Sequence, residues 1–208
     1  MRFSSFFANQ AKKPTGWFGR IVMSRIFDIG NARLNRFVYE VLSPQTGDHV
    51  LEIGSGTGKL LDKIALQVEG CVVEGIDFSD TMVSISRLKN RKHIEKGKVF
   101  IHEGNIDDVL FTAEMYTKIC SVNTIYFWPN PETTTRKIVR LLRPEGMLAL
   151  GYEDIAQLEQ RQLDTGVFRF YSISDVETLL IDAGFTGVVT TQSIRVGSSV
   201  FHCTVAIK

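Results

Sequence analysis

Three alternating glycines directly after a short apolar run constrain the fold of this chain more than any other feature. Residues 50–58 read VLEIGSGTG, and a helix-forming segment follows at residues 59–61. This order predicts a buried strand, a tight turn and the start of a helix. Glycine lets the backbone adopt positive φ and approach a ligand closely. The helix N-terminus then presents free N–H groups, so we predict a nucleotide-type binding site at this turn.

Three interpretations of the glycines compete. A P-loop requires four residues between its glycines and a serine or threonine after its lysine. Here only three residues separate Gly54 from Gly58, and a leucine follows the lysine, which disfavours a P-loop. The dinucleotide fingerprint G-x-G-x-x-G needs its third glycine one residue later, although Asp77 lies where its ribose-binding acid is expected. A turn without a ligand needs only one or two glycines, so a nucleotide site is favoured.

A second motif follows the first at the spacing expected for the next strand. The pattern E-x-G-x-G-x-G that starts at Glu52, together with the sequence GIDFS at residues 75–79, resembles the S-adenosylmethionine-binding motifs of class I methyltransferases. In that family the glycine loop passes under the amino-acid part of the cofactor. The resemblance implies that Asp77 binds both ribose hydroxyls and that Phe78 lies against the adenine. A carboxylate at a strand end can accept two hydroxyl hydrogen bonds at once.

The resemblance extends from about residue 31 to the end of the chain. Asn105 stands where many relatives have an aspartate that contacts the adenine amino group, and an amide oxygen can accept the same hydrogen bond. Asn123 follows the fourth expected strand, where the backbone usually meets the methionine end of the cofactor. Thr117 and Glu145 depart from the family pattern, which commonly has an acid and a glycine there. The implied S-adenosylmethionine-binding residues are Glu52, Gly54, Ser55, Gly56, Gly58, Asp77, Phe78, Asn105, Ile106 and Asn123.

Strand and helix signals alternate along most of the chain, which predicts a parallel sheet with helices on both faces. Two closely joined strands at the end of the chain predict an antiparallel hairpin. With the resemblance, the expected fold is α/β and Rossmann-like, with a seven-stranded, mostly parallel sheet and an antiparallel terminal hairpin. Strands are expected at 48–53, 71–76, 98–102, 117–123, 146–152, 188–195 and 199–207, and helices at 1–13, 17–28, 32–42, 58–68, 80–95, 131–142 and 174–183.

The N-terminal part of the chain differs in charge from the rest. Residues 1–40 carry seven Lys or Arg against two acids, whereas the remainder carries seventeen against twenty-one. We predict an N-terminal helical lid and substrate segment over residues 1–45, and an S-adenosylmethionine-binding methyltransferase domain over residues 46–208. A partner-binding or peripheral membrane surface at residues 1–28 is the alternative. Stable membrane insertion is not expected, because no apolar run has membrane-spanning length.

The segment after the fourth expected strand bears on the substrate. Residues 123–129 read NTIYFWP and lack the double proline that amino-directed DNA and RNA methyltransferases place there. The net charge of +1 also disfavours a nucleic-acid partner. We therefore expect a small-molecule methyl acceptor, with Tyr126, Trp128 and Trp17 as candidate walls of its pocket. Ordinary packing of these aromatic side chains is the alternative.

No general base stands out. His102, Tyr126, Glu153 and Asp154 lie near expected strand ends, but a structural role is favoured for each, so the catalytic residue stays unassigned. The methyl donor supplies the reactivity, and the protein needs only to position the reactants. Three cysteines without C-x-x-C spacing predict no metal site and reduced thiols in a cytoplasmic protein.

The sequence thus predicts an S-adenosylmethionine-dependent methyltransferase that acts on a small, aromatic or lipophilic acceptor by in-line displacement. Two alternatives stay open. One is an NAD(P)-dependent reductase. The other is a non-catalytic cofactor-binding module that acts through a protein partner.

Overall fold

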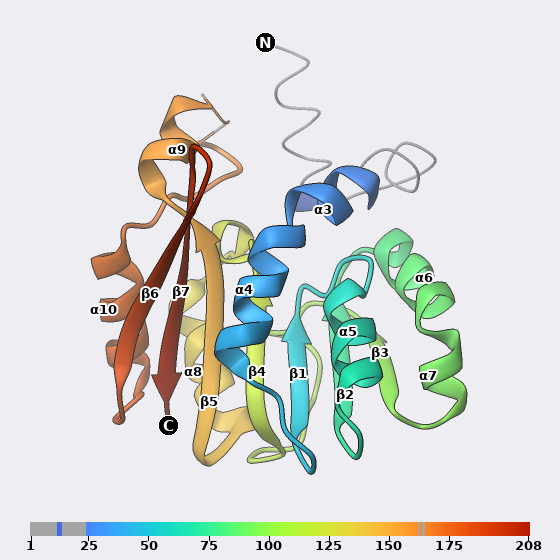
Figure 1. Cartoon of the computed structure of the whole chain (residues 1–208). Helices are drawn as coiled ribbons and strands as arrows, with labels where there is room; N and C mark the ends of the chain where they lie inside the picture. Colours follow the sequence, from blue (N-terminus) through green and yellow to red (C-terminus); the bar gives the residue numbers. More distant parts are fainter. Residues whose placement is uncertain (1–11, 14–23, 162, 164) are drawn as a thin grey trace.

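A seven-stranded sheet, ordered β3-β2-β1-β4-β5-β7-β6, forms the centre of the part of the chain that the structure describes (Figure 1). This computed structural model describes residues 12–13, 24–161, 163 and 165–208. The first five strands are parallel, and β7 pairs antiparallel with both β5 and β6. The predicted fold class and terminal hairpin are confirmed. The strands are β1 (His49–Ile53), β2 (Val72–Asp77), β3 (Val99–Glu103), β4 (Tyr116–Val122), β5 (Leu142–Glu153), β6 (Val189–Val196) and β7 (Ser199–Ile207).

Helices cover both faces of this sheet. In Figure 1, α4 and α5 lie in front of the sheet, and α8 and α10 lie behind it. The described helices are α3 (Ser24–Gly30), α4 (Ala32–Leu42), α5 (Lys59–Gln67), α6 (Asp80–Lys89), α7 (Arg91–Glu95), η2 (Ile125–Phe127), α8 (Pro131–Leu141), α9 (Ile155–Gln160) and α10 (Ile173–Ala183).

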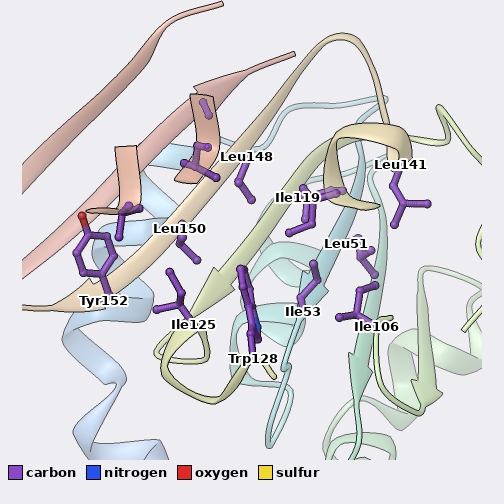
Figure 2. Close-up of a cluster of buried hydrophobic side chains, with 14 of the residues drawn as sticks. Leu51, Ile53, Ile106, Ile119, Ile125, Trp128, Leu141, Leu148, Leu150 and Tyr152 are labelled. Carbon is purple, nitrogen blue, oxygen red and sulfur yellow. The ribbon is translucent and has the colours of Figure 1, made fainter. Parts of the chain in front are cut away.

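The two-sided burial explains why the central strands are apolar along their whole length. Successive side chains of a strand point to opposite faces. Val50 therefore packs in the cluster under α4 and α5, whereas Leu51 packs in the cluster under α8 and α10. Figure 2 shows Leu51 with Ile119 and Leu148 in the second cluster. The same alternation places Glu52 on the α4 and α5 side, at the end of β1.

Three sequence predictions need correction. The helix expected over residues 80–95 is two helices, because the buried Asn90 donates to the carbonyls of Gly58 and Ser86 and interrupts it. The helix expected from residue 174 is instead capped at Ser172, which forms a capping box with Asp175. Strand β5 begins at residue 142 rather than 146, and helix α9 was not predicted.

The N-terminal predictions are only partly covered by the structure. The expected helix at residues 1–13, most of that at 17–28, and Trp17 lie outside the described residues. Helix α4 occupies the predicted residues 32–42, and its buried face packs on β4, β5 and β7. The division at residue 45 stays a prediction. Among the described helices, none has the length and apolar character needed to cross a membrane.

Candidate functional site

The carboxyl ends of the parallel strands meet at one edge of the sheet, below α3 and α9 (Figure 1). A cavity of about 850 Å³ opens there. In open α/β sheets this edge is where ligands bind. The predicted site residues that line the cavity are Glu52, Gly54, Ser55, Gly56, Asp77, Phe78, Asn105, Ile106, Asn123, Tyr126 and Trp128.

Two glycines of the loop between β1 and α5 differ in what surrounds them. Gly54 has φ of 72°, and a Cβ there would overlap the side chain of Thr124. Gly56 has φ of 51°, but no described atom lies within 4 Å of the position of its Cβ. Gly56 therefore faces the open cavity, and a side chain there would occupy ligand space.

Gly58 has a different environment from the other two glycines. It lies outside the cavity lining and is the N-cap residue of α5, with φ of 73°. A Cβ at Gly58 would overlap the Ser86 hydroxyl and lie 2.5 Å from the Asn90 amide nitrogen. The structure places this glycine at the contact between α5 and α6. The absence of a side chain at Gly58 therefore allows α5 and α6 to pack closely.

Glu52 carries a buried carboxyl, one oxygen of which has no hydrogen-bond partner among the described residues. The residue is 3% exposed, and its Oε2 has no hydrogen-bond partner in the described part of the protein. Burial, and then the charge of Asp77, raise the pKa of Glu52 well above its ordinary value. An uncompensated buried acid is costly unless a ligand supplies a donor or a positive charge.

Asp77 ends β2 and organises the loop opposite. Its Oδ2 accepts the Gly56 N–H at 2.8 Å, and its Oδ1 accepts the Ser79 N–H at 2.9 Å. Burial raises the pKa of Asp77, and these two backbone bonds oppose that rise. Each oxygen keeps a second lone pair for a ligand hydroxyl. The adjoining Phe78 is half-buried, and the Lys13 ammonium lies 5.8 Å from its ring centroid.

The loops after β3 and β4 complete this half of the cavity. Asn105 lines the cavity, and its Oδ1 also accepts the N–H of Asp107 at 3.2 Å, which makes it a turn-forming residue as well. The neighbouring Ile106 is buried. Asn123 has φ of 55°, and its side-chain amide donates to Asn31 at 2.9 Å. The site thus joins loops from four strands with the start of α4.

Two of the predicted aromatic residues, Tyr126 and Trp128, are packed in the core and also line the cavity. Trp128 is 6% exposed and packs in the core beside Ile53 and Ile125 (Figure 2), yet it also lines the cavity. The Tyr126 hydroxyl accepts the Glu153 N–H at 2.6 Å and donates to Asn123 Oδ1 at 3.2 Å. Burial raises the pKa of Tyr126 far above its ordinary range, so this phenol is not available as a base.

The sequence did not predict the contacts that join α3 to the glycine loop and to α6. The Asp28 carboxylate of α3 accepts hydrogen bonds from Thr57 of the glycine loop and, at 3.0 Å, from Lys89 of α6. Lys59 donates to the Asp28 carbonyl at 2.9 Å. These contacts hold the end of α3 against the cavity. The sequence around Asp28 contains no local pattern that predicts these contacts, because all three partners are distant in sequence.

The rest of the second half of the cavity, beyond Tyr126 and Trp128, was also missed. It is lined by side chains from α9, the β7 strand and the segment before α10, including Leu158, Arg161, Phe168 and Phe201. One usable signal was present. Asp154 before Ile155 is a helix N-cap pattern, and in the structure Asp154 accepts the Ala156 N–H at 3.0 Å.

Comparisons with known proteins agree with this geometry. Residues 51–150 match the sequence model of a family described as a methyltransferase domain. Residues 51–150 thus form a methyltransferase domain of the class I, S-adenosylmethionine-dependent type. Among curated relatives of this methyltransferase, the uncharacterized methyltransferase YdaC of Bacillus subtilis is 30% identical over 120 residues, which is 58% of this chain and 64% of YdaC. The O-methyltransferase cnsE of Penicillium expansum is 26% identical over 182 residues, covering 82% of this chain and 64% of cnsE.

Solved structures similar to this methyltransferase share its fold. A SAM-dependent methyltransferase from Aquifex aeolicus has a TM-score of 0.70 at 21% identity, covering 88% of this chain and 95% of that one. The [4+2]-cyclase SpnF has a TM-score of 0.71 at 15% identity, covering 85% of this chain and 80% of that one. The chain spans about half to two thirds of the first curated relatives that it matches. Because the similar structures include a cyclase as well as a methyltransferase, the fold accommodates more than one reaction, and the activity has to be argued from the site.

Proposed function

We propose that this methyltransferase binds S-adenosylmethionine in the half of the cavity formed by β1, β2 and β3, and transfers its methyl group to a small molecule in the other half. One observation carries the proposal. Three features lie in one cavity. Glu52 has a carboxyl oxygen without a partner among the described residues, Gly56 presents a backbone without a side chain to open space, and Asp77 has carboxylate lone pairs that can accept ligand hydroxyls.

The residues present fit the cofactor piece by piece. Asp77 would accept the two ribose hydroxyls, and Phe78 would lie against the adenine. Glu52 would face the positively charged amino group of the methionine part, either directly or through water. That contact supplies the charge that the buried carboxyl lacks within the described chain. Gly56 would let the loop backbone approach the cofactor closely.

The chemistry asked of the protein is mainly positioning. When bound, S-adenosylmethionine supplies an activated methyl group. The chain holds the acceptor in line with that methyl group and keeps water out. Residues of the 1–45 segment support the covering role, because Lys12, Asp28, Ile29, Asn31 and Arg33 line the cavity.

A small and at least partly apolar acceptor suits the second half of the cavity. Its lining includes the side chains of Phe127, Leu158, Phe168 and Phe201. A volume of about 850 Å³ lies within the usual range for small-molecule sites. The names of curated relatives such as cnsE include O-methyltransferase. The three cysteines are buried and unpaired, which supports the proposed cytoplasmic location.

Calorimetric titration with S-adenosylmethionine and S-adenosylhomocysteine, with NAD and NADP as comparisons, tests the cofactor. We expect saturable binding of the first pair alone. Asp77→Ala should weaken it by roughly 2–4 kcal/mol, because two hydrogen bonds to a charged acceptor are lost. Asp80→Asn is the matched control, since Asp80 is exposed and lies outside the cavity lining.

Each alternative has its own outcome. Binding of NAD or NADP instead would support the reductase and refute the proposal. Binding of S-adenosylmethionine without methyl transfer to any acceptor would support the non-catalytic module. Wild-type affinity in the Asp77→Ala protein would remove this residue from the ribose site.

A further inference from the structure

One carboxylate in the second half of the cavity, that of Glu153, has no part in the proposed cofactor site. Glu153 is the last residue of β5, and it lies opposite Phe201 in the antiparallel register with β7. Its side chain is 14% exposed, and its Oε2 is fully buried. Arg161 Nη2 lies 2.6 Å from that oxygen, but the pair does not have hydrogen-bond geometry.

The other titratable groups near the strand ends are committed elsewhere. His102 contacts Glu74 at 2.6 Å, at a distance from the cavity lining. Asp154 caps α9 and contacts His202 at 3.1 Å. The Tyr126 hydroxyl is held between Glu153 N–H and Asn123, as described above. Among the described residues, the carboxyls of Glu52 and Glu153 each combine a place in the lining with an oxygen that accepts no hydrogen bond. Glu52 is assigned above to the cofactor, which leaves Glu153 for the acceptor.

The position of Glu153 suits contact with a reacting atom. Its backbone N–H is joined to Asn123 through the Tyr126 hydroxyl by bonds of 2.6 and 3.2 Å. Asn123 is the residue at which the methionine end of the cofactor is proposed to lie. The backbone of Glu153 is therefore close to the boundary between the two halves of the cavity, and the residue itself lines the cavity.

Aromatic side chains in the same cavity indicate the shape of the methyl acceptor. Tyr126, Phe127 and Phe168 form a cluster with ring centroids 4.8 to 6.5 Å apart. These rings pack against one another in the core, and a flat aromatic ligand can form the same kind of contact with their exposed parts. Each ring lines the cavity, so the ligand ring can pack against this cluster.

We propose that Glu153 is the general base of the reaction and that the acceptor is an aromatic alcohol, a phenol or naphthol, which is methylated on oxygen. The proposal rests on the proposed function for the methyl donor. The acceptor hydroxyl donates to the other carboxylate oxygen of Glu153, Oε1, and lies within reach of the Arg161 guanidinium, which pairs with Oε2. Charge favours a hydroxyl over an amine: Glu153 and Arg161 offset one another, which leaves no net negative charge to attract a cationic amine.

The step is balanced without a further reactant. The acceptor oxygen forms a bond to the methyl carbon as the carbon–sulfur bond of the donor breaks. The electron pair of that bond goes to sulfur, which becomes a neutral thioether. The hydroxyl proton moves to Glu153 and is then released to solvent. Arg161 stabilises the negative charge that develops on the acceptor oxygen.

The test uses the full chain with 1-naphthol and 1-naphthylmethylamine, which share one ring system and differ in charge at neutral pH. Binding to the protein saturated with S-adenosylhomocysteine is followed by the fluorescence of the ligand. Methyl transfer is measured with S-adenosylmethionine. We expect the naphthol, and not the cationic amine, to bind and to be methylated.

The Glu153→Gln variant distinguishes a role of Glu153 as the base from a purely structural role. The amide oxygen still accepts a hydrogen bond, so naphthol binding should change little, whereas kcat near neutral pH should fall by about a hundredfold. The rate in Glu153→Gln should then rise about tenfold for each pH unit, because the acceptor must ionise without help. Arg161 and Tyr126 are the titratable neighbours that face Glu153, and both stay unchanged. Glu153→Asp should restore part of kcat.

Glu159→Gln is the matched control, since Glu159 is exposed on the same short helix, outside the lining. It should behave as wild type. Wild-type kcat and pH dependence in Glu153→Gln would overturn the assignment of the base. Stronger binding or methylation of the amine, or no binding of naphthol, would overturn the acceptor class. In each of these cases calorimetric binding of S-adenosylhomocysteine still reports separately on the proposed function.

Discussion

Replacing Gly58 by alanine is expected to damage the fold, although this glycine belongs to the motif that indicated a ligand. The residue has φ of 73°, where an alanine costs about 1 kcal/mol. The added Cβ would lie 2.5 Å from the Asn90 amide nitrogen, which donates to the carbonyls of Gly58 and Ser86 at 3.1 and 3.0 Å. Displacing this buried amide costs about 2 kcal/mol more. The expected loss of unfolding free energy is about 3 kcal/mol.

Two other glycines provide matched comparisons. Gly197 in the β6–β7 turn has φ of 62°, and no described atom lies within 4 Å of the position of its Cβ. Gly197→Ala should therefore lose only about 1 kcal/mol of unfolding free energy. Gly56→Ala should lose a similar amount of stability, because its Cβ also meets open space. Its affinity for S-adenosylhomocysteine should nevertheless fall at least about tenfold, since the methyl group enters the proposed cofactor space.

Urea unfolding followed by far-ultraviolet circular dichroism measures all three variants. Gly58→Ala should have a clearly lower free energy of unfolding than Gly197→Ala. Equal stability of these two variants would refute the packing role of Gly58. A Gly56→Ala protein that binds the cofactor with unchanged affinity would refute the orientation of the loop.

Three further predictions concern charged residues. Burial alone would raise the pKa of Glu74, but hydrogen bonds from His102 and His49 outweigh it and lower that pKa from 4.5 to about 2. Glu74 therefore stabilises the fold above its unfolded pKa, and this contribution of about 3 kcal/mol is lost as the pH falls from about 4.5 to 2. Acid unfolding of Glu74→Gln should lack this loss, and an unchanged profile would contradict the pairing. Asp28→Ala removes the tie of α3 to the glycine loop, so backbone amides of residues 24–30 should exchange with solvent about tenfold faster, whereas unchanged exchange would show that the tie holds nothing. Asp77→Asn keeps the shape of the side chain but loses its charge, so S-adenosylhomocysteine should bind at least about tenfold more weakly, and wild-type affinity would contradict the ribose role.

The central part of the fold could be predicted because its signals are local. The apolar runs at β1, β2 and β4 reflect burial on both faces, and this burial depends little on distant residues. The motif residues Glu52 and Asp77 were found for a similar reason. They come directly after or within short strands whose ends must meet at one edge of a parallel sheet.

The parts that were missed depend on contacts between distant residues. The break at Asn90 arises from its bond to Gly58, which lies 32 residues earlier. The place of Leu158 in the cavity depends on α9, a helix of 6 residues that is too short for a clear periodic pattern. The role of Gly58 could not be separated from that of Gly56, because the motif gives the same residue type at both positions. Only their surroundings distinguish packing from ligand approach.

A crystal structure of the protein with S-adenosylhomocysteine would test the central claim most directly. We predict the ribose hydroxyls within hydrogen-bond distance of Asp77, the adenine beside Phe78 and the amino group of the ligand facing Glu52. The ligand sulfur should point toward the half of the cavity that contains Glu153. A ligand bound elsewhere, or a cavity that stays empty at saturating ligand, would contradict the account.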